Sequence, residues 1–249
     1  MAATVRRTLA VAQRVLRQLK HDRRFIALTL FVPVAIIYVL YVFFDSIENP
    51  LFNATPYVIS FGAFIIHFLT FVLTAIVIVR ERVSETLTRM LVNGYGQTEI
   101  ILGYLMAYTT LATLQSLLVL TEITYLFELD YAFGRLASIY LVMWLLAVIS
   151  MALGIFVSNF ARNEGQVFPF IPLILLPSIF LSGIVLAVER LPEWAQVLSR
   201  ATPLFYATEV LHTLVDGGEL LDNTQALLSL PLYGLAILIL ARFTLRETS

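Results

Sequence analysis

Long uncharged stretches alternate with short polar ones along most of the chain, and their lengths predict membrane-spanning helices. A helix needs about 20 residues to cross a hydrocarbon core roughly 30 Å thick. Stretches that approach or exceed this length cover residues 25–44, 57–79, 100–127, 136–157, 167–188 and 226–241. We therefore expect an all-α, polytopic membrane protein with six transmembrane helices, forming a single transmembrane domain over residues 1–249.

Residues 1–24 precede the first span and follow a helical period. Apolar residues that share one face of this segment are Val5, Leu9, Ala12, Leu16 and Leu19. The opposite face carries arginine and lysine, so the pattern predicts a basic amphipathic helix. Such a helix is typical of the membrane interface, with its apolar side in the acyl boundary and its cations toward anionic membrane lipid. The alternative is a soluble helix packed on another domain.

The longest polar passage between two spans covers residues 80–99. Its charged residues are Arg80, Glu81, Arg82, Glu85, Arg89 and Glu99. Each charge would cost about 2.5–3.5 kcal/mol at the centre of a bilayer, so this passage is expected at the membrane surface or beyond.

The same passage predicts an elbow made of one short helix and one turn. Apolar residues at spacings of three and four favour the helix, and Glu85 with Arg89 forms an i,i+4 pair in the favourable order. Asn93–Gly94 then predicts the end of the helix. Thr98 is the expected N-cap of the following span, with Glu99 in its first turn.

Residues 189–224 are half apolar and predict two short helices on the other side of the membrane. The helices are expected to open near Pro192 and Pro203 and to stop at Gly217–Gly218. Each is too short to cross the bilayer, and Trp194 suits an interfacial depth. This pattern favours an external re-entrant or surface-lying hairpin.

The positions of lysine and arginine predict the orientation. With a cytoplasmic N-terminus, thirteen of the 16 basic residues, Arg246 included, lie on inside segments, and three lie outside. This asymmetry follows the positive-inside rule, and six spans then place both termini in the cytoplasm. We expect a multi-pass protein of the cell membrane with residues 80–99 forming a cytoplasmic elbow.

Composition excludes several kinds of chemistry. The chain is 59% hydrophobic and 13% charged, whereas soluble domains carry about 25% charged residues. It has no cysteine, so disulfides, thiolate nucleophiles and Cys-ligated metals are excluded, and we expect no metal site and no nucleic-acid partner. The phosphate-binding motif GxxxxGK[ST] is absent, as are HExxH and GxSxG, so the chain is expected neither to bind ATP nor to act as an enzyme.

Two ionisable residues lie inside predicted spans. His67 or Glu122 would suit proton relay or substrate contact in a stand-alone secondary transporter or channel. The alternatives are a neutral histidine bonded to a neighbouring carbonyl and a glutamate near the outer interface. The phenylalanines of the second span form either a binding wall or a surface packed against lipid and core.

Two motifs resemble the type 2 ABC exporter permeases. The pattern of that family between spans two and three is roughly RERxxGTLExLL, a turn, and then EIIxGK. Residues that match it are Arg80-Glu81-Arg82, Thr86-Leu87, Leu91 and Glu99-Ile100-Ile101-Leu102-Gly103. Glu85 stands where the family usually has Gly, Thr88 where it has Glu, and Tyr104 where it has Lys. Residues 176–183, 191–194 and 202–207 resemble the family signature L-SG, LP-W and NP-L-Y-A, with Thr202 in place of Asn.

The resemblance implies a homodimer, or a heterodimer with a related permease, that works with separate ABC ATPase subunits. ATP and Mg would be bound by those partners, and this chain would bind no cofactor. The elbow would be the coupling helix. Residues that would couple it to the ATPase are Arg80, Glu81, Arg82, Glu85, Thr86, Leu87 and Arg89. The alternative is that these charges are solvated ends of two spans.

The resemblance also implies outward transport through a pathway at the dimer axis, lined by spans two and five. Candidate pathway residues are Phe64, His67, Phe68, Phe71, Phe180 and Ser182. The phenylalanines are compatible with a hydrophobic or amphipathic substrate, drug-like or lipid-like. Polysaccharide, peptide and sodium export are alternatives within the same family, and an intramembrane enzyme ranks last.

Overall fold

The computed structural model describes residues 2–47 and 54–244, and no residue in these two ranges lies in a strand. The helices are α1 (Ala2–His21), α2 (Arg23–Asp45), α3 (Thr55–Val83), α4 (Thr86–Val92), α5 (Gln97–Leu126), α6 (Phe133–Ser158), η1 (Glu164–Val167), α7 (Phe170–Leu181), η2 (Val188–Arg190), α8 (Glu193–Ser199), α9 (Pro203–Val215) and α10 (Thr224–Thr244). Arg246, which the sequence-based orientation counts as cytoplasmic, lies outside the described residues.

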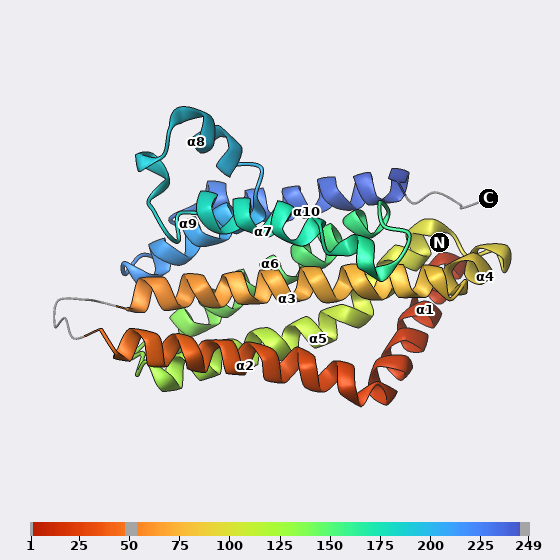
Figure 1. The fold of residues 1–249 in the computed structure, drawn as a ribbon, viewed down its shortest axis with the longest axis horizontal. Helices are drawn as coiled ribbons and strands as arrows, with labels where there is room; N and C mark the ends of the chain where they lie inside the picture. Colours follow the sequence, from red (N-terminus) through yellow and green to blue (C-terminus); the bar gives the residue numbers. More distant parts are fainter. Residues whose placement is uncertain (1, 48–53, 245–249) are drawn as a thin grey trace.

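Six helical segments of the described chain are long and apolar enough to cross a membrane, which confirms the predicted number. They are α2, α3, α5, α6, the η1–α7 segment and α10, and they follow the long axis of the molecule (Figure 1). The fifth segment ends at Leu181 rather than near residue 188. The chain turns there because Gly183 adopts a left-handed conformation with φ 89°, which glycine tolerates without a steric penalty.

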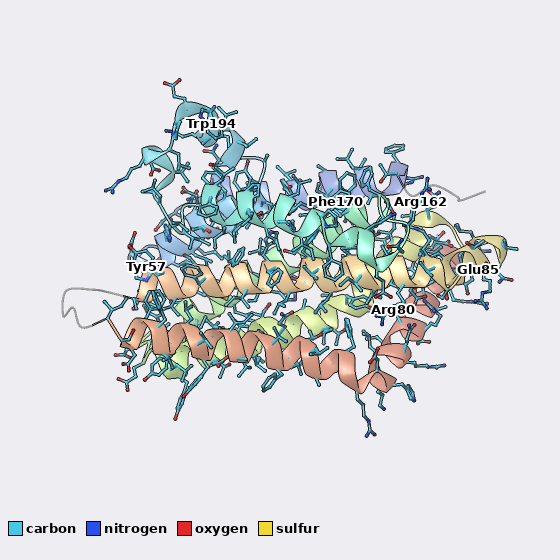
Figure 2. All side chains as sticks on the ribbon, in the orientation of Figure 1. Tyr57, Arg80, Glu85, Arg162, Phe170 and Trp194 are labelled. Carbon is cyan, nitrogen blue, oxygen red and sulfur yellow. The ribbon has the colours of Figure 1, made fainter. Side chains whose placement is uncertain are left out.

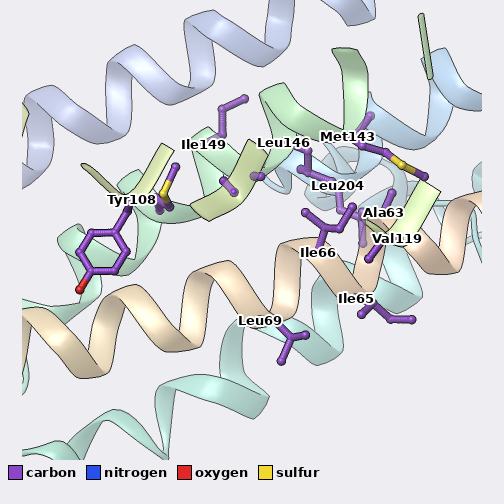
Figure 3. Close-up of a cluster of buried hydrophobic side chains, with 14 of the residues drawn as sticks. Ala63, Ile65, Ile66, Leu69, Tyr108, Val119, Met143, Leu146, Ile149 and Leu204 are labelled. Carbon is purple, nitrogen blue, oxygen red and sulfur yellow. The ribbon is translucent and has the colours of Figure 1, made fainter. Parts of the chain in front are cut away.

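Helices α3 and α6 form the centre of the bundle. Their most apolar windows are each 72% buried, and α5, α9 and α10 pack around them. Figure 3 shows buried side chains such as Ile66, Leu146 and Leu204 meeting in this core. A Cβ atom at Gly154 of α6 would lie 2.7 Å from the carbonyl oxygen of Phe71 on α3. A small residue at this position therefore permits the close helix contact that is typical of membrane bundles.

The outer surface is formed by α2, α7 and α10. The apolar window of each corresponding segment is only 22% buried. Large exposed apolar side chains include Phe31, Val39, Leu173, Leu232 and Phe243. In a bilayer such surfaces contact lipid or another subunit.

Helix α1 packs on protein along part of its apolar face. Val11, Val15 and Leu19 are buried, and a Cβ atom at Gly103 of α5 would lie 2.6 Å from the Val11 side chain. The predicted apolar face is thereby divided, since Ala12 and Leu19 are buried while Val5, Leu9 and Leu16 stay exposed. One stripe of α1 therefore joins the bundle, and a second, adjacent stripe is free.

The two short helices predicted between residues 189 and 224 are present as α8 and α9. Helix α9 packs on α3, α6 and α10, and its side chains Leu204, Val210 and Leu211 are fully buried. Helix α8 projects away from the bundle (Figure 1), and Trp194 on it is 69% exposed. Only α9 is therefore inserted among the long helices.

Candidate functional site

The elbow predicted from the sequence is formed by the end of α3 and by α4. Helix α3 continues to Val83, so Arg80, Glu81 and Arg82 belong to its last turn. At the junction, Glu85 adopts the left-handed conformation with φ 59° and ψ 12°. Glycine occupies this region freely, whereas other residues lose about 1–2 kcal/mol there. The position where the resembling family has Gly is therefore one whose backbone favours Gly.

Helix α4 has one buried face and one exposed face. Leu87 and Met90 are buried, while Glu85 and Arg89 are exposed. Figure 2 shows Glu85 at the extreme end of the molecule. The exposed face also includes Thr88 and Val92, which the sequence pattern did not indicate as functional. The helix ends as predicted, with Asn93 as C-cap followed by Gly94 at φ 81°.

The predicted pairing of Glu85 with Arg89 is wrong. The Arg89 guanidinium donates to main-chain carbonyls instead, at 2.7 Å from Ser84 O and 3.4 Å from Glu85 O. An i,i+4 pair requires both residues to follow the helix. Glu85 is the left-handed N-cap of α4, so its side chain leaves the helix surface.

Glu81 is buried, with 4% of its surface exposed, and it attaches α1 to the end of α3. Arg14 Nη2 lies 3.1 Å from Glu81 Oε2, and Gln18 Nε2 donates to Glu81 Oε1 at 2.8 Å. The same Arg14 nitrogen donates to the hydroxyl of Tyr104 on α5. Three helices therefore meet at one carboxylate.

Arg82 and Arg80 attach α3 to other parts of the chain. The Arg82 guanidinium donates to Ser158 O at 2.6 Å, at the end of α6. It also donates to Asn159 Oδ1 at 2.9 Å and to Ala161 O at 3.0 Å, just after that helix. Arg80 forms a two-point contact with the Glu164 carboxylate at 3.0 and 3.2 Å. The charged residues of this last turn therefore engage partners within the protein.

The start of α5 is also connected to α1. Its N-cap is Gly96 rather than Thr98, because Glu99 Oε2 accepts a hydrogen bond from Gly96 N at 2.9 Å. Arg7 donates to Gly94 O at 2.6 Å and lies 3.8 Å from Glu99. Helix α1 thus contacts both sides of the turn that follows α4.

These contacts join α1, α4, the last turn of α3 and the first turns of α5 into one unit, which we name the elbow platform. Sequence reasoning missed Arg7, Arg14 and Gln18 as parts of it, since α1 alone gave only an amphipathic pattern. The spacing of Arg14 and Gln18, four residues apart on one face, is the only local sign of a shared partner. Hydrogen bonds and ion pairs connect the helices of the platform, so we expect them to move together as a rigid body.

The candidate pathway residues divide into accessible and buried groups. Phe64 and Phe68, both on α3, stack on each other with ring centroids 6.4 Å apart. They are half-buried and pack in the same cluster as residues of α7. Phe180 is 55% exposed. His67, Phe71 and Ser182 are fully buried within the subunit. Phe64, Phe68 and Phe180 can therefore face a neighbouring subunit or a substrate without rearrangement of the helices.

His67 is bonded to a side chain of α6. Its Nδ1 lies 2.7 Å from Ser150 Oγ, and that hydroxyl donates to Leu146 O at 2.6 Å. Since the hydroxyl has one proton, His67 Nδ1 is the donor and Nε2 is an acceptor. Nε2 is buried without a hydrogen-bond partner among the described residues. A structural histidine was expected to bond to a neighbouring carbonyl, whereas His67 bonds to the hydroxyl of Ser150.

Glu122 lies one turn from the end of α5, near the end of the bundle opposite α4. Its Oε2 is buried and has no hydrogen-bond partner among the described residues. Within those residues, no group of three or more His, Asp or Glu side chains is arranged to hold a metal ion. His67 and Glu122 therefore belong to no metal-binding cluster of the described residues.

A protein-family model described as "ABC-2 type transporter" matches residues 6–214. This chain belongs to the ABC-2 type transporter family. The family domain is the non-catalytic membrane permease of an ABC transporter, and ATP hydrolysis in the family is implied for a partner ATPase. The matched range includes α4 and both motifs quoted from the sequence.

Curated relatives of this ABC-2 chain include two Escherichia coli K12 proteins. "Probable multidrug ABC transporter permease YbhR" is 28% identical over 139 residues, which cover 56% of this chain and 38% of the relative. "Probable multidrug ABC transporter permease YbhS" is 25% identical over 150 residues, covering 60% and 40%. "ABC transporter G family member 20" of Dictyostelium discoideum is 23% identical over 143 residues, covering 57% and 20%. The matched segment thus spans less than half the length of these relatives.

Proposed function

We propose that this ABC-2 chain is the membrane-spanning subunit of an ATP-driven exporter and moves a hydrophobic or amphipathic molecule outward. The proposal rests on the two faces of α4. Leu87 and Met90 are buried and anchor this short helix to the bundle, while Glu85 and Arg89 are exposed. A separate ABC ATPase, which binds ATP and Mg, docks on this exposed face. The docking side is the cytoplasm, as the positive-inside distribution favours.

The polar residues of the elbow have two different roles. Glu85, Thr88 and Arg89 contact the ATPase, whereas Glu81 and Arg82 hold the platform together and carry its movement into α1, α3 and α6. This division is supported by the internal hydrogen bonds of Glu81 and Arg82 and by the exposure of Glu85 and Arg89. A bonded platform would pass on a rigid-body displacement that a flexible loop would absorb.

The transport pathway lies between two permease subunits, either two copies of this chain or this chain and a related one. It passes along Phe64 and Phe68 of α3 and Phe180 of α7. Two curated relatives from one organism, both named as probable multidrug permeases, support pairing of related subunits and a drug-like or lipid-like cargo. The outer helices α2 and α7, which are mostly exposed in the single subunit, offer the surface for this pairing.

Co-purification with an ABC ATPase tests the proposal. Glu85→Arg and Arg89→Glu should each abolish co-purification or uncouple ATP hydrolysis from transport, because a charge of the wrong sign costs several kcal/mol at a contact. Glu193→Lys on exposed α8, at the other end of the bundle, is the control and should leave both intact. Retained binding and coupling in both α4 variants would reject this face as the docking site.

A stand-alone secondary transporter is the second candidate, favoured by the buried, unpartnered Nε2 of His67. It predicts proton-gradient-driven flux in liposomes without any ATPase, and His67→Ala should abolish that flux. Flux that persists in His67→Ala would remove the motive for this candidate. The two functions are separated by the requirement for ATP.

A further inference from the structure

A large cavity lies at the end of the bundle opposite α4, among the ends of α2, α5 and α6. Its volume is about 1060 Å³, just above the roughly 300–1,000 Å³ found for small-molecule sites. The residues that line it are Tyr41, Leu117, Leu120, Thr121, Thr124, Tyr125, Leu126, Glu128, Leu129, Asp130, Phe133, Leu136, Ala137 and Tyr140. None of these residues belongs to the candidate transport pathway described above.

The cavity combines apolar walls with an acidic edge. Leu117, Leu120 and Leu136 supply aliphatic wall. Tyr41 and Tyr140 add aromatic rings from α2 and α6, and ring faces attract cations. Glu128 and Asp130 contribute carboxylates from the loop that joins α5 to α6. The lining therefore suits a molecule with a large apolar body and a positive charge.

The two carboxylates have no cationic partner within the described residues, whose ion pairs are Arg7–Glu99, Arg14–Glu81 and Arg80–Glu164. The basic residue beside this loop is Arg135, and its guanidinium is engaged elsewhere. It lies 5.5 Å from the ring centroid of Tyr131 and donates to Gly217 O at 3.1 Å. Arg135 and Asp130 line a neighbouring pocket together, but the described ion pairs include neither Glu128 nor Asp130. The two carboxylates therefore remain available to attract a cationic ligand.

We propose that this cavity binds a lipophilic organic cation, such as a tetraarylphosphonium or a quaternary ammonium with a large apolar body. The carboxylates of Glu128 and Asp130 set the charge preference, and the leucine and tyrosine walls bury the apolar body. In the proposed orientation the site opens at the outer face of the membrane. Binding here requires neither ATP nor the ATPase, so it stands apart from the proposed export function.

The test measures binding of radiolabelled tetraphenylphosphonium to the purified permease in dodecyl maltoside, by equilibrium dialysis against empty micelles. Tetraphenylborate, an anion of the same shape, and dodecylphosphocholine, a zwitterionic lipid-like detergent, serve as competitors. We expect saturable binding that tetraphenylborate does not displace. Glu128→Gln with Asp130→Asn should weaken it about ten-fold, as expected for the loss of two partly exposed ion pairs.

Two further variants separate the site from general effects on folding. Ala137→Phe places bulk on an exposed wall position of the cavity and should reduce binding while the melting temperature is unchanged. Glu193→Gln removes an exposed carboxylate from α8, away from the cavity, and should bind like the wild type. Displacement of the cation by dodecylphosphocholine at equal concentration would show a lipid site and overturn the proposal. Binding that ignores both the carboxylate and the Ala137→Phe variants would overturn it as well.

Discussion

The bond between Arg14 and Glu81 should control whether α1 stays on the bundle, and Arg14→Ala tests this directly. The substitution removes a charged hydrogen bond of 3.1 Å and the contact with Tyr104, and it leaves the buried carboxylate with Gln18 alone. Breaking a fully buried ion pair costs about 3–5 kcal/mol. Because the Arg14 side chain is 36% exposed, solvent screening reduces this, and we expect about 2 kcal/mol for detachment of α1.

The natural absence of cysteine makes the detachment measurable. Val15 is 2% exposed and faces the bundle, so the single thiol of Val15→Cys should react with a maleimide only when α1 opens. A loss of about 2 kcal/mol should raise its labelling rate roughly 30-fold when opening and closing are fast. Leu9→Cys, on the 45% exposed position of the same helix, should label quickly at the same rate with or without Arg14→Ala.

A double-mutant cycle then separates the ion pair from other effects of the substitution. Glu81→Gln keeps a hydrogen-bond acceptor for Gln18 but removes the negative charge. In the Glu81→Gln variant, Arg14→Ala should therefore lower the free energy for detachment of α1 by less than in the wild type, the difference being about 1 kcal/mol or more. Additive effects in the cycle would show that the two side chains act independently. Equal labelling rates of Val15→Cys with and without Arg14→Ala would refute the reasoning outright.

Three further predictions concern backbone strain, helix packing and protonation. Glu85→Gly should raise the free energy of unfolding by up to about 1 kcal/mol, and the melting temperature with it, because glycine relieves the left-handed strain. Glu85→Ala should not raise the melting temperature. Equal rises in both variants would contradict the argument that the positive φ of Glu85 is strained. Gly154→Ala should cost about 1–3 kcal/mol since its Cβ meets main-chain atoms of α3, while Gly134→Ala, with nothing within 4 Å, should cost nothing; equal melting temperatures would dispose of the packing argument. Burial raises the pKa of Glu209 above its ordinary value of 4.5, and Glu189 adds to this. The contribution of protonated Glu209 to the stability of the fold is therefore complete below pH 4.5 and is lost as pH rises through the folded-state pKa. Glu209→Gln should flatten the fall of the melting temperature above pH 4.5. A melting temperature that depends on pH as in the wild type would disprove this role of Glu209.

The number and order of the spans could be predicted because each depends on a local property, about 20 apolar residues in a row. The end of α4 was equally local, since Asn93–Gly94 carries its own turn signal. Span five was predicted too long because apolar residues continue after Gly183, and hydrophobicity alone does not record the left-handed turn there. The structure therefore differs from the pattern where backbone conformation, rather than burial, sets the boundary.

The partners of the elbow charges could not be predicted from the sequence. Glu81 pairs with a residue 67 positions earlier, and Arg82 bonds to carbonyls 76 and 79 positions later. Such contacts depend on how α1 and α6 return to the same end of the bundle, and no local pattern encodes that return. Arg80, Glu81 and Arg82 were therefore predicted to contact the ATPase, or else to be solvated ends of two spans, although each has a partner within the chain.

The internal contacts of α3 limit how a push on α4 can travel, if the ATPase docks there as proposed. The elbow platform joins α4 to α1, α3 and α5, and α3 is packed against α6 along its length, with Gly154 permitting main-chain contact. Separating α3 from α6 would expose their shared core, so these helices should move together. Helices α2 and α7 are held by far less buried surface, and relative movement is cheapest where the least apolar area is lost. A push on α4 should therefore shift the α3–α6 core against α2, α7 and the facing subunit, which is where Phe64, Phe68 and Phe180 lie in the proposed pathway.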